Sequence, residues 1–341
     1  MVENVIIMAG GEGRRLRPLT ELRPKPLMPL LDEPVVGMTL RLLRRHGIHS
    51  ATLTVCYRAE DIRRALGDGS AYGMTLRYAE EETPRGTAGS VRDAARDMEG
   101  TVLVLSGDGL TDADLTALWE RHRASGAKAS LVVKRVDNPG KYGVCETDDT
   151  GRVLRFAEKP GKAARPGSLV NTGIYFLEKD VLDRISEEGQ YDFGRELFPA
   201  MLAAGVKLQA LETDAYWCDI GSPSAYARAQ SDLLAGRVAL SVPGLRRGGA
   251  ILGRGCRLGP GVRIEGRCYV GSYARVDGGT VLGTGTVIGS GACVGRNVHL
   301  ENACLWAGAR VDGGAILKNV VVMPQTGNRA LQRMVSTGGK N

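Results

Sequence analysis

The first residues that could take part in chemistry lie near the start of the chain, in the stretch AGGEGRRLRPLTELRPKP at residues 9–26. Three glycines follow a short apolar run, and arginines and a lysine come after them. Glycine lets the backbone turn sharply, so that successive N–H groups can surround the oxygens of a phosphate. Arginine can bridge two such oxygens and lysine adds a compact positive charge. The stretch therefore predicts a phosphate-binding loop.

Two common nucleotide-binding patterns do not fit this loop. No Gly-Lys-Ser/Thr follows at the spacing of a P-loop, and the G-x-G-x-x-G spacing of a dinucleotide-binding turn is absent. A basic surface loop is the alternative explanation. Such a loop would carry the arginines, but it would not need Gly10, Gly11 and Gly13 directly after a buried strand.

The composition is ordinary for a soluble globular protein of two domains. The chain has 341 residues, of which 43% are hydrophobic and 24% charged. Its formal net charge is +7, but no dense Lys/Arg run with interleaved aromatic residues indicates a nucleic-acid partner. We find no signal peptide and no apolar run of about 18 residues, so we expect no membrane partner. The seven cysteines form no Cys-x-x-Cys pair, which predicts reduced thiols in a cytoplasmic protein and no zinc site.

The first two thirds of the chain alternate between short apolar runs and segments of helical periodicity. We expect strands at residues 5–9, 51–56, 76–79, 102–106 and 129–133, and helices at residues 35–46, 59–66, 88–98 and 115–125. This alternation predicts an α/β fold with a doubly wound, mainly parallel sheet. In such a sheet the ligand lies beyond the C-terminal ends of the strands. The glycine-rich loop falls there, and so does Asp108, a carboxylate that follows the expected strand at residues 102–106.

The sequence after about residue 245 repeats every six residues. Ten aliphatic or large apolar residues recur at this spacing from Leu252 to Trp306, and most are followed by Gly, Asp or Glu. A small or β-branched residue stands two positions before each of them, as at Cys256, Cys268 and Cys304. Neither a helix nor a simple strand has a period of six, whereas a β-solenoid places one short strand per repeat on each face of a prism. We therefore predict a β-solenoid, with these cysteines in small inward positions.

The opening stretch resembles the signature G-G-x-G-T-R-L-x-P-L-T-x-x-x-P-K-P of the sugar-1-phosphate nucleotidylyltransferases, also called NDP-sugar pyrophosphorylases. It departs from that signature at Arg14, where threonine is usual. Six further segments resemble motifs of the same family, in the family's order: PRGTAGS (84–90), SGDGLTD (106–112), KYGVCE (141–146), FAEKP (156–160), VNTGIYF (170–176) and WCDIGSP (217–223). Each motif alone has an ordinary explanation, such as a turn carboxylate, but seven in order favour the family.

The resemblance also implies the domain organisation. A Rossmann-like nucleotidyltransferase domain would occupy residues 1–240. The six-residue repeat resembles the left-handed parallel β-helix of hexapeptide-repeat proteins, which many members of the family carry, and would occupy residues 245–322. A polar tail would follow at residues 323–341.

The same resemblance implies roles for individual residues. Arg15 would contact the pyrophosphate leaving group, Lys25 would neutralise phosphate charge, and Asp108 would act in catalysis and bind Mg²⁺ together with Asp219. The implied nucleotide-binding residues are Ala9, Gly10, Gly11, Gly13, Arg14, Gly86, Thr87 and Gly89. The implied sugar-phosphate-binding residues are Gly143, Glu158, Lys159, Asn171 and Thr172.

The implied reaction joins a nucleoside triphosphate to a hexose 1-phosphate and releases pyrophosphate. The nucleophile is already an anion, so the reaction needs positioning and charge neutralisation rather than a strong general base. The segments EEETPRGTAGS, DNPGKYGVCETDDTGRVLRFAEKP and YDFGRELFP most resemble those of mannose-1-phosphate guanylyltransferases, which favours GTP and mannose 1-phosphate. Thymidylyl-, uridylyl-, cytidylyl- and adenylyltransferases share most of this frame and remain alternatives.

Two other classes of function are open from the sequence, together with an assembly role. A catalytically silent regulatory subunit could share this fold, but it would not need to keep its phosphate-binding cations and metal carboxylates. An acyltransferase could use the solenoid, but the repeat offers only His299, which alternation with Leu300 should turn outward. The flat faces of a solenoid also predict a homo-oligomer.

Overall fold

The structure, a computed structural model, describes residues 2–324 and 334–336. These residues form two compact units, each assembled from several segments of the chain. The α/β unit comprises the described residues up to Glu12, with Pro24–Leu27 and Val36–Asp219. The β-helix unit comprises Gly13–Arg23, Met28–Val35 and the described residues from Ile220 onward. Most of the predicted polar tail at residues 323–341 lies outside the described residues.

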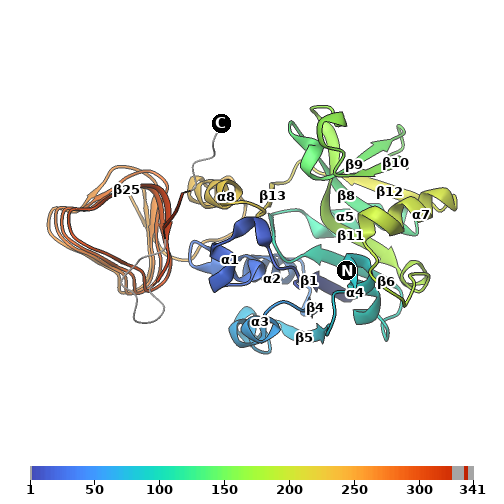
Figure 1. Cartoon of the computed structure of the whole chain (residues 1–341), viewed down its shortest axis with the longest axis horizontal. Coiled ribbons are helices and arrows are strands. Elements are labelled where there is room, and N and C mark those ends of the chain that lie inside the picture. The colour runs from blue at the N-terminus through green and yellow to red at the C-terminus, as the bar shows by residue number, and fades with distance from the viewer. Residues whose placement is uncertain (1, 325–333, 337–341) are drawn as a thin grey trace. The chain divides into compact units, whose positions relative to one another are not determined.

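The α/β unit is built on a nine-stranded mixed sheet (Figure 1). Its main path runs β10 (Val153–Glu158), β9 (Gly143–Thr147), β11 (Ser168–Glu178), β6 (Thr101–Ser106), β1 (Asn4–Met8), β4 (Ser50–Val55) and β5 (Thr75–Glu80), while β8 (Ala129–Val136) pairs with β11 and β12 (Leu208–Glu212) pairs with β8. Strands β6, β1, β4 and β5 are parallel, whereas β11 runs antiparallel to its three neighbours. The predicted α/β fold is confirmed, and β11 joins its parallel part to the rest of the sheet.

Helices cover both faces of this sheet. Among the described residues, the α/β unit contains α2 (Val35–Arg45, from Val36 on), α3 (Ala59–Leu66), α4 (Gly86–Ala94), α5 (Leu115–Ser125), α6 (Lys179–Leu182) and α7 (Phe198–Ala203). Helices α1 (Leu19–Leu22) and α8 (Pro223–Ala235) belong to the β-helix unit. Adjacent residues of a strand point to opposite faces, and on β11 Tyr175 packs against Phe198 of α7 while Phe176 packs against Trp119 of α5. The sheet therefore lies between two helical layers, as expected of a doubly wound fold. No described helix combines the length and apolar character required to cross a bilayer.

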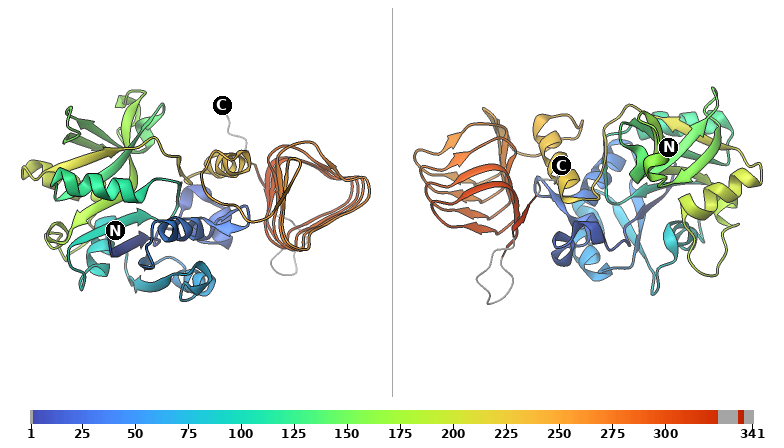
Figure 2. Two further views of the ribbon diagram at one scale, coloured as in Figure 1. Left: turned by 180° about the vertical axis from the view of Figure 1, so that it is seen from behind. Right: turned by 45° about the horizontal axis from the view of Figure 1, so that its top comes forward.

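Residues 250–322 form a parallel β-helix, which confirms the predicted solenoid (Figure 2). Its strands are β15 (Ala250–Leu252), β16 (Arg257–Leu258), β17 (Arg263–Ile264), β18 (Cys268–Val270), β19 (Arg275–Val276), β20 (Val281–Leu282), β21 (Thr286–Ile288), β22 (Cys293–Val294), β23 (His299–Leu305), β24 (Arg310–Val311) and β25 (Ile316–Val322), with β14 (Leu245–Arg247) and β26 (Met334–Ser336) antiparallel at β15 and β25. Val270, Leu282, Ile288 and Leu300 are fully buried in its core. Stacking of these apolar rows stabilises coils that could not fold singly.

The six-residue spacing breaks near the end of the β-helix, which corrects two sequence-based expectations. Ile288 pairs with Leu305, so the inward position belongs to Leu305 and not to Trp306. Asn302 has a φ of +47°, in the left-handed region, and the coil around it is one residue shorter than the coil before it. Cys304 therefore leaves the core, unlike Cys268, and its sulfur lies 3.5 Å from the Gln230 side-chain amide.

Candidate active site

The ends of two adjacent parallel strands create the floor of the candidate site. Met8 at the end of β1 pairs with Ser106 at the end of β6, and the backbone N–H of Gly107 donates to the Met8 carbonyl at 2.9 Å. The glycine-rich loop therefore begins beside Asp108. This is the edge of the sheet at which open α/β folds bind their ligands.

Three charged side chains meet at this edge. The Lys25 Nζ donates to the Asp108 carboxylate and lies 3.1 Å from Asp219 Oδ1. Lys25 begins a single helical turn, Lys25–Leu27. Asp219 ends strand β13 (Trp217–Asp219), which pairs with β7 (Gly109–Thr111) so that Asp219 lies opposite Gly109, the neighbour of Asp108. The pairing of β13 with β7 thus explains why two carboxylates distant in sequence face one ammonium group.

The charges of Lys25 and Asp108 each favour the ionised state of the other. Burial would lower the pKa of Lys25, but the carboxylates of Asp108 and Asp219 outweigh burial and raise it. Burial would raise the pKa of Asp108, but the Lys25 ammonium and a hydrogen bond from Ser106 Oγ, at 2.5 Å, lower it. The Lys25 side chain is 10% exposed, against 28% for Asp108. A cluster with this charge pattern can bind a cation or neutralise a phosphate beside it.

A cavity of about 340 Å³ opens next to Asp108. It is lined by Met8, Gly10, Gly11, Thr54, Cys56, Glu81, Pro84, Gly86, Thr87, Ser90, Ser106, Asp108, Gln190 and Asp192. The glycine-rich loop, the strand ends and the segment resembling the G-T-A-G element all contribute. We call it the loop cavity.

The G-T-A-G segment forms the first turn of α4 and packs against a second segment of backbone. Gly86 has a φ of +76°, and a Cβ there would come 2.6 Å from the backbone nitrogen of Tyr191. The N–H groups of Ala88 and Gly89 donate to the Tyr191 carbonyl at 2.8 and 3.0 Å. The small residues of this turn therefore admit the Tyr191 backbone.

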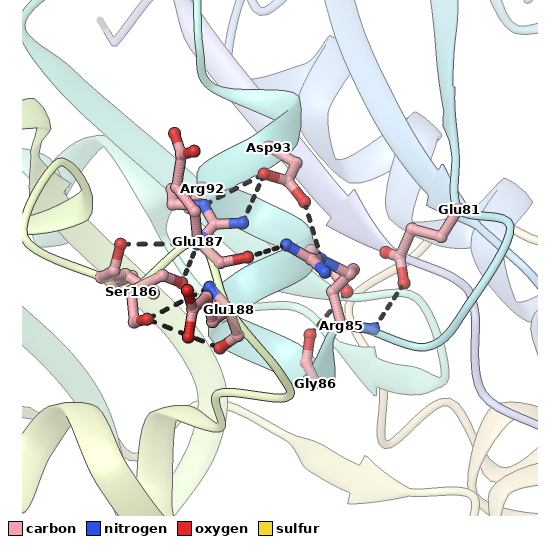
Figure 3. Close-up of polar contacts among 10 residues, drawn as sticks. Glu81, Arg85, Gly86, Arg92, Asp93, Ser186, Glu187 and Glu188 are labelled. Carbon is pink, nitrogen blue, oxygen red and sulfur yellow. Dashed lines mark hydrogen bonds and ion pairs between the residues drawn. The ribbon is translucent and has the colours of Figure 1, made fainter.

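Polar contacts fix this turn to the segment before Tyr191 (Figure 3). The Asp93 carboxylate accepts hydrogen bonds from Arg92 and lies 3.4 Å from the Arg85 guanidinium. Arg85 in turn donates to the Glu187 carbonyl and Arg92 to the Ser186 carbonyl. The backbone N–H of Arg85 donates to a carboxylate that lines the loop cavity, that of Glu81. These contacts therefore connect three segments of the loop-cavity wall to one another: Glu81, the start of α4 and the segment before Tyr191.

Asp192 belongs to the walls of two cavities. Its Oδ1 accepts from the Thr87 backbone N–H at 3.2 Å and from the Thr87 hydroxyl at 2.8 Å. A second cavity, of about 260 Å³, shares Met8, Thr87, Ser106 and Asp192 with the first and is further lined by Glu158, Lys159, Asn171, Gly173, Tyr175, Phe193, Gly194 and Arg195. We call it the strand cavity. The hydrogen-bonded pair of Thr87 and Asp192 therefore stands between two adjoining binding volumes.

The strand cavity carries charges suited to a phosphorylated ligand. Lys159 Nζ lies 2.8 Å from Glu158 Oε1, and Arg195 is a lining residue of the same cavity. Asn171 donates to the Tyr175 hydroxyl at 2.8 Å, and its Oδ1 accepts from the Gly173 N–H. Carboxylate and amide groups can bind sugar hydroxyls, while the two cations can bind a phosphate.

The structure places the remaining expected site residues as follows. Thr172 is buried, and its hydroxyl donates to the Val132 carbonyl at 2.7 Å, so it does not line the strand cavity. Gly143 lies behind the cavity wall, where a Cβ would come 2.9 Å from Glu158 Oε2. Gly89 faces Tyr191, as described above. Ala9 is buried, and its N–H donates to the Thr54 carbonyl.

Three expected phosphate-binding residues belong to the β-helix unit. Gly13, with a φ of +64°, precedes the single helical turn Arg14–Leu16. Arg14 and Arg15 are exposed in that turn. The glycine-rich loop thus spans a point where the chain passes from one unit to the other, after Glu12.

Several cavity residues were not singled out from the sequence. Asp192 and Arg195 fall within YDFGRELFP, a segment noted only for its resemblance to one branch of the family. Cys56 and Glu81 follow the parallel strands β4 and β5, so their position at the strand ends was the available signal. The described residues contain no group of three or more His, Cys, Asp or Glu side chains that could hold a metal ion.

Comparison with known proteins agrees with this geometry. Residues 4–236 match the family model described as nucleotidyl transferase. A mannose-1-phosphate guanylyltransferase of Mycobacterium tuberculosis is 34% identical over 299 residues, 82% of each chain. A UTP–glucose-1-phosphate uridylyltransferase of Synechocystis sp. is 33% identical over 93% of this chain and 86% of its own. The crystal structure of HddC from Yersinia pseudotuberculosis, 24% identical, covers 68% of this chain and all of its own with a TM-score of 0.61, which supports the fold. The chain belongs to the nucleotidyl transferase family.

Proposed function

We propose that this protein transfers a nucleotidyl group from a nucleoside triphosphate to a hexose 1-phosphate and releases pyrophosphate. The observation that carries the proposal is the cluster of Lys25, Asp108 and Asp219, in which Asp108 lines the loop cavity and the strand cavity adjoins it. The loop cavity would hold the nucleotide, because the glycine-rich loop and the α4 turn line it. The strand cavity would hold the sugar phosphate, because Glu158, Lys159 and Arg195 line it.

In this reaction an oxygen of the sugar 1-phosphate attacks the α-phosphorus of the triphosphate, the bond to the β-phosphate oxygen breaks, and pyrophosphate leaves in line. No proton has to be removed from the nucleophile. The protein supplies position and positive charge. Lys159 and Arg195 would orient the attacking phosphate, Lys25 would neutralise charge near the α-phosphate, and Arg15 would contact the leaving group.

Asp108 and Asp219 have the chemistry of ligands for a magnesium ion. Magnesium prefers oxygen ligands and takes one or two carboxylates together with phosphate oxygens and water. Both carboxylates reach the same lysine nitrogen, so both face one centre of positive charge. Bound there, magnesium would reduce the negative charge on the triphosphate. The Lys25 ammonium offsets the negative charge of both carboxylates.

We favour GTP and mannose 1-phosphate as the substrates. The mycobacterial relative named as a mannose-1-phosphate guanylyltransferase supports this choice. The cyanobacterial relative, at nearly the same identity, is named as a glucose-1-phosphate uridylyltransferase, so UTP with glucose 1-phosphate is the second candidate pair. The reaction would take place in the cytoplasm, and we expect a homo-oligomer, which light scattering of the purified protein would test.

The decisive experiment is a turnover panel. Purified protein with Mg²⁺ is offered GTP, UTP, dTTP, CTP and ATP, each with mannose 1-phosphate or glucose 1-phosphate, and pyrophosphate release is followed. We expect turnover with a single preferred pair, GTP with mannose 1-phosphate. Turnover with UTP and glucose 1-phosphate would overturn the substrate choice but keep the reaction class. No turnover with any pair would favour a regulatory subunit.

A further inference from the structure

Two of the three clustered charges lie where the chain passes between its two units. Lys25 belongs to Pro24–Leu27, four residues of the α/β unit between two segments of the β-helix unit. Asp219 is the last residue of the α/β unit before Ile220 begins the final part of the β-helix unit. Asp108, in contrast, lies well inside the α/β unit. The backbone on both sides of Lys25 is therefore held by contacts within the β-helix unit.

The segment before Lys25 is held by an aromatic ring. The Arg23 guanidinium lies 5.6 Å from the ring centre of Trp306, at a distance suited to a cation–π contact. Trp306 is the residue displaced from the inward row by the short coil, and its ring nitrogen donates to the Tyr226 hydroxyl of α8 at 3.1 Å. The break in the six-residue spacing thus supplies the surface on which Arg23 rests.

The segment after Lys25 is held by α8. This segment forms a hairpin of two strands, β2 (Pro29–Leu30) and β3 (Glu33–Pro34). The Pro29 carbonyl accepts from the Tyr226 hydroxyl at 2.5 Å and from the Gln230 amide at 2.9 Å, and the Leu31 N–H donates to Gln230 Oε1 at 2.9 Å. Gln230 is 2% exposed, so these bonds are shielded from water.

The tip of this hairpin is bonded directly to the β-helix. Asp32 Oδ2 accepts from the backbone N–H of Ser290 at 2.6 Å and from its hydroxyl at 2.5 Å. Asp32 has a φ of +75°, a conformation that aspartate tolerates better than most residues. A Cβ at Gly271 would come 2.4 Å from Asp32 Oδ2, so only glycine leaves room for this carboxylate. The contact has the form of a specific attachment point.

One outward-facing row of the β-helix, near the hairpin, is apolar and buried. Successive coils place Ile251, Tyr269, Val287, Cys304 and Val321 side by side on that face, and all five are buried although they point away from the core. Helix α8 contacts this row through Tyr226, whose hydroxyl lies 3.6 Å from the Cys304 sulfur. Burial of this apolar face stabilises the packing of the elements that cover it.

We propose that the β-helix unit is a frame that fixes the backbone around Lys25, and that Asp32, through Ser290, is a positioning residue for the transfer step. The inference rests on the proposed function of Lys25. Charge stabilisation depends on donors that are already in place when the transition state forms. Release of the Asp32 attachment would let the Lys25 segment move, and turnover would fall while substrate binding changes little.

The test compares four variants of the full chain. Asp32→Ala removes the attachment, Asp32→Asn keeps an acceptor oxygen, and Ser290→Ala removes one donor. Ser272→Ala is the matched control, because Ser272 occupies the same register position one coil earlier. We expect Asp32→Ala to lower kcat about tenfold or more, with KM for both substrates within about threefold. Asp32→Asn should recover part of the loss, Ser290→Ala should show a smaller loss, and Ser272→Ala should match the parent.

A double-mutant cycle asks whether Asp32 acts through Lys25. In a Lys25→Met background, Asp32→Ala should lower kcat by less than about twofold, because the group it positions is already absent. An equal fold loss in both backgrounds would overturn the proposal, as would a normal kcat for Asp32→Ala. If Asp32→Ala does not fold, Ser290→Ala carries the same cycle.

A second readout does not depend on turnover. Lysine acylation of the substrate-free protein, mapped by mass spectrometry, should show Lys25 several-fold more accessible in Asp32→Ala, with the exposed Lys128 unchanged as internal control. Unchanged Lys25 labelling would overturn the positioning role. Increased labelling in a protein that releases no pyrophosphate with any substrate pair would keep it and reject the proposed function instead.

Discussion

Lys25 and Asp219 are 194 residues apart in the sequence, yet the lysine ammonium lies 3.1 Å from the aspartate carboxylate. Asp108 completes the contact from the end of β6. One largely buried ammonium group therefore forms ion pairs with two carboxylates, and each member of the cluster comes from a different part of the chain.

Loss of the Lys25 charge should nearly stop the reaction. Lys25→Met keeps the length of the side chain but removes the ammonium group, and we expect kcat to fall by about 10² or more. Pyrophosphate release under saturating substrates measures this directly. Lys128→Met is the matched control, since Lys128 pairs with Asp180 on an exposed surface at 2.9 Å. A Lys25→Met protein within a few-fold of the parent rate would remove Lys25 from the catalytic group.

The negative charge of Asp108 should be as necessary for turnover as the positive charge of Lys25. Asp108→Asn has the same shape, and Lys25 retains its contact with Asp219, so we expect the fold to persist while turnover falls about 10²-fold or more. Thermal unfolding checks the fold, and a titration with Mg²⁺ checks the origin of the loss. A near-normal rate at ordinary Mg²⁺ concentrations would contradict the proposed metal role of Asp108.

The pH dependence of stability should report the same cluster. The lowered pKa of Asp108 means that its ion pair stabilises the fold above about pH 3.8 and is lost as the pH falls through the lower folded value. The raised pKa of Lys25 means that its contribution holds below about pH 10.5 and is lost as the pH rises through the higher folded value.

We therefore expect the parent to exceed Lys25→Met in free energy of unfolding by about 2–3 kcal/mol near neutral pH. The difference should shrink at both extremes, and urea unfolding at several pH values measures it. A difference that stays constant down to pH 3 would contradict the ion-pair explanation.

Much of this fold could be read from local patterns. Helices α3 and α5 begin and end at the predicted residues, because their apolar spacing and, for α5, the Asp114 cap are local signals. Helix α4 was expected from residue 88 but begins at Gly86, since a left-handed glycine stabilised by the distant Tyr191 backbone starts its first turn. Local periodicity carries no information about such a partner.

The same limit applies to the β-helix and to the site. Trp306 fits the six-residue spacing in sequence, but its burial against Tyr226 and the left-handed backbone at Asn302 move it out of the row. The contact of Lys25 with Asp219 depends on the pairing of β7 with β13, which no local pattern reveals. The family motifs named the residues, and only the folded chain showed which of them touch.

Asp192 should contribute to the use of both substrates. Its carboxylate holds both the N–H and the hydroxyl of Thr87, between the loop cavity and the strand cavity. Asp192→Ala should lower kcat/KM about tenfold or more for each substrate, because hydrogen bonds to a charged group contribute about 1.5–3 kcal/mol. Asp192→Asn keeps an acceptor and should lose less. A loss confined to one substrate would place Asp192 in a single subsite.

Lys159 should act on the sugar phosphate in particular. Its ammonium group lies 2.8 Å from Glu158 Oε1, both residues line the strand cavity, and Lys159 does not line the loop cavity, so Lys159→Ala removes the proposed phosphate ligand from one cavity alone. We expect KM for the hexose 1-phosphate to rise about tenfold or more, while KM for the triphosphate changes by less than about threefold.

Lys162→Ala is the control for this change, because Lys162 lies three residues further on, in an exposed turn that does not line the cavity. Initial rates with each substrate varied in turn separate the two constants. If the KM for the triphosphate rose as much as that for the sugar phosphate, the assignment of the two cavities to separate substrates would be wrong.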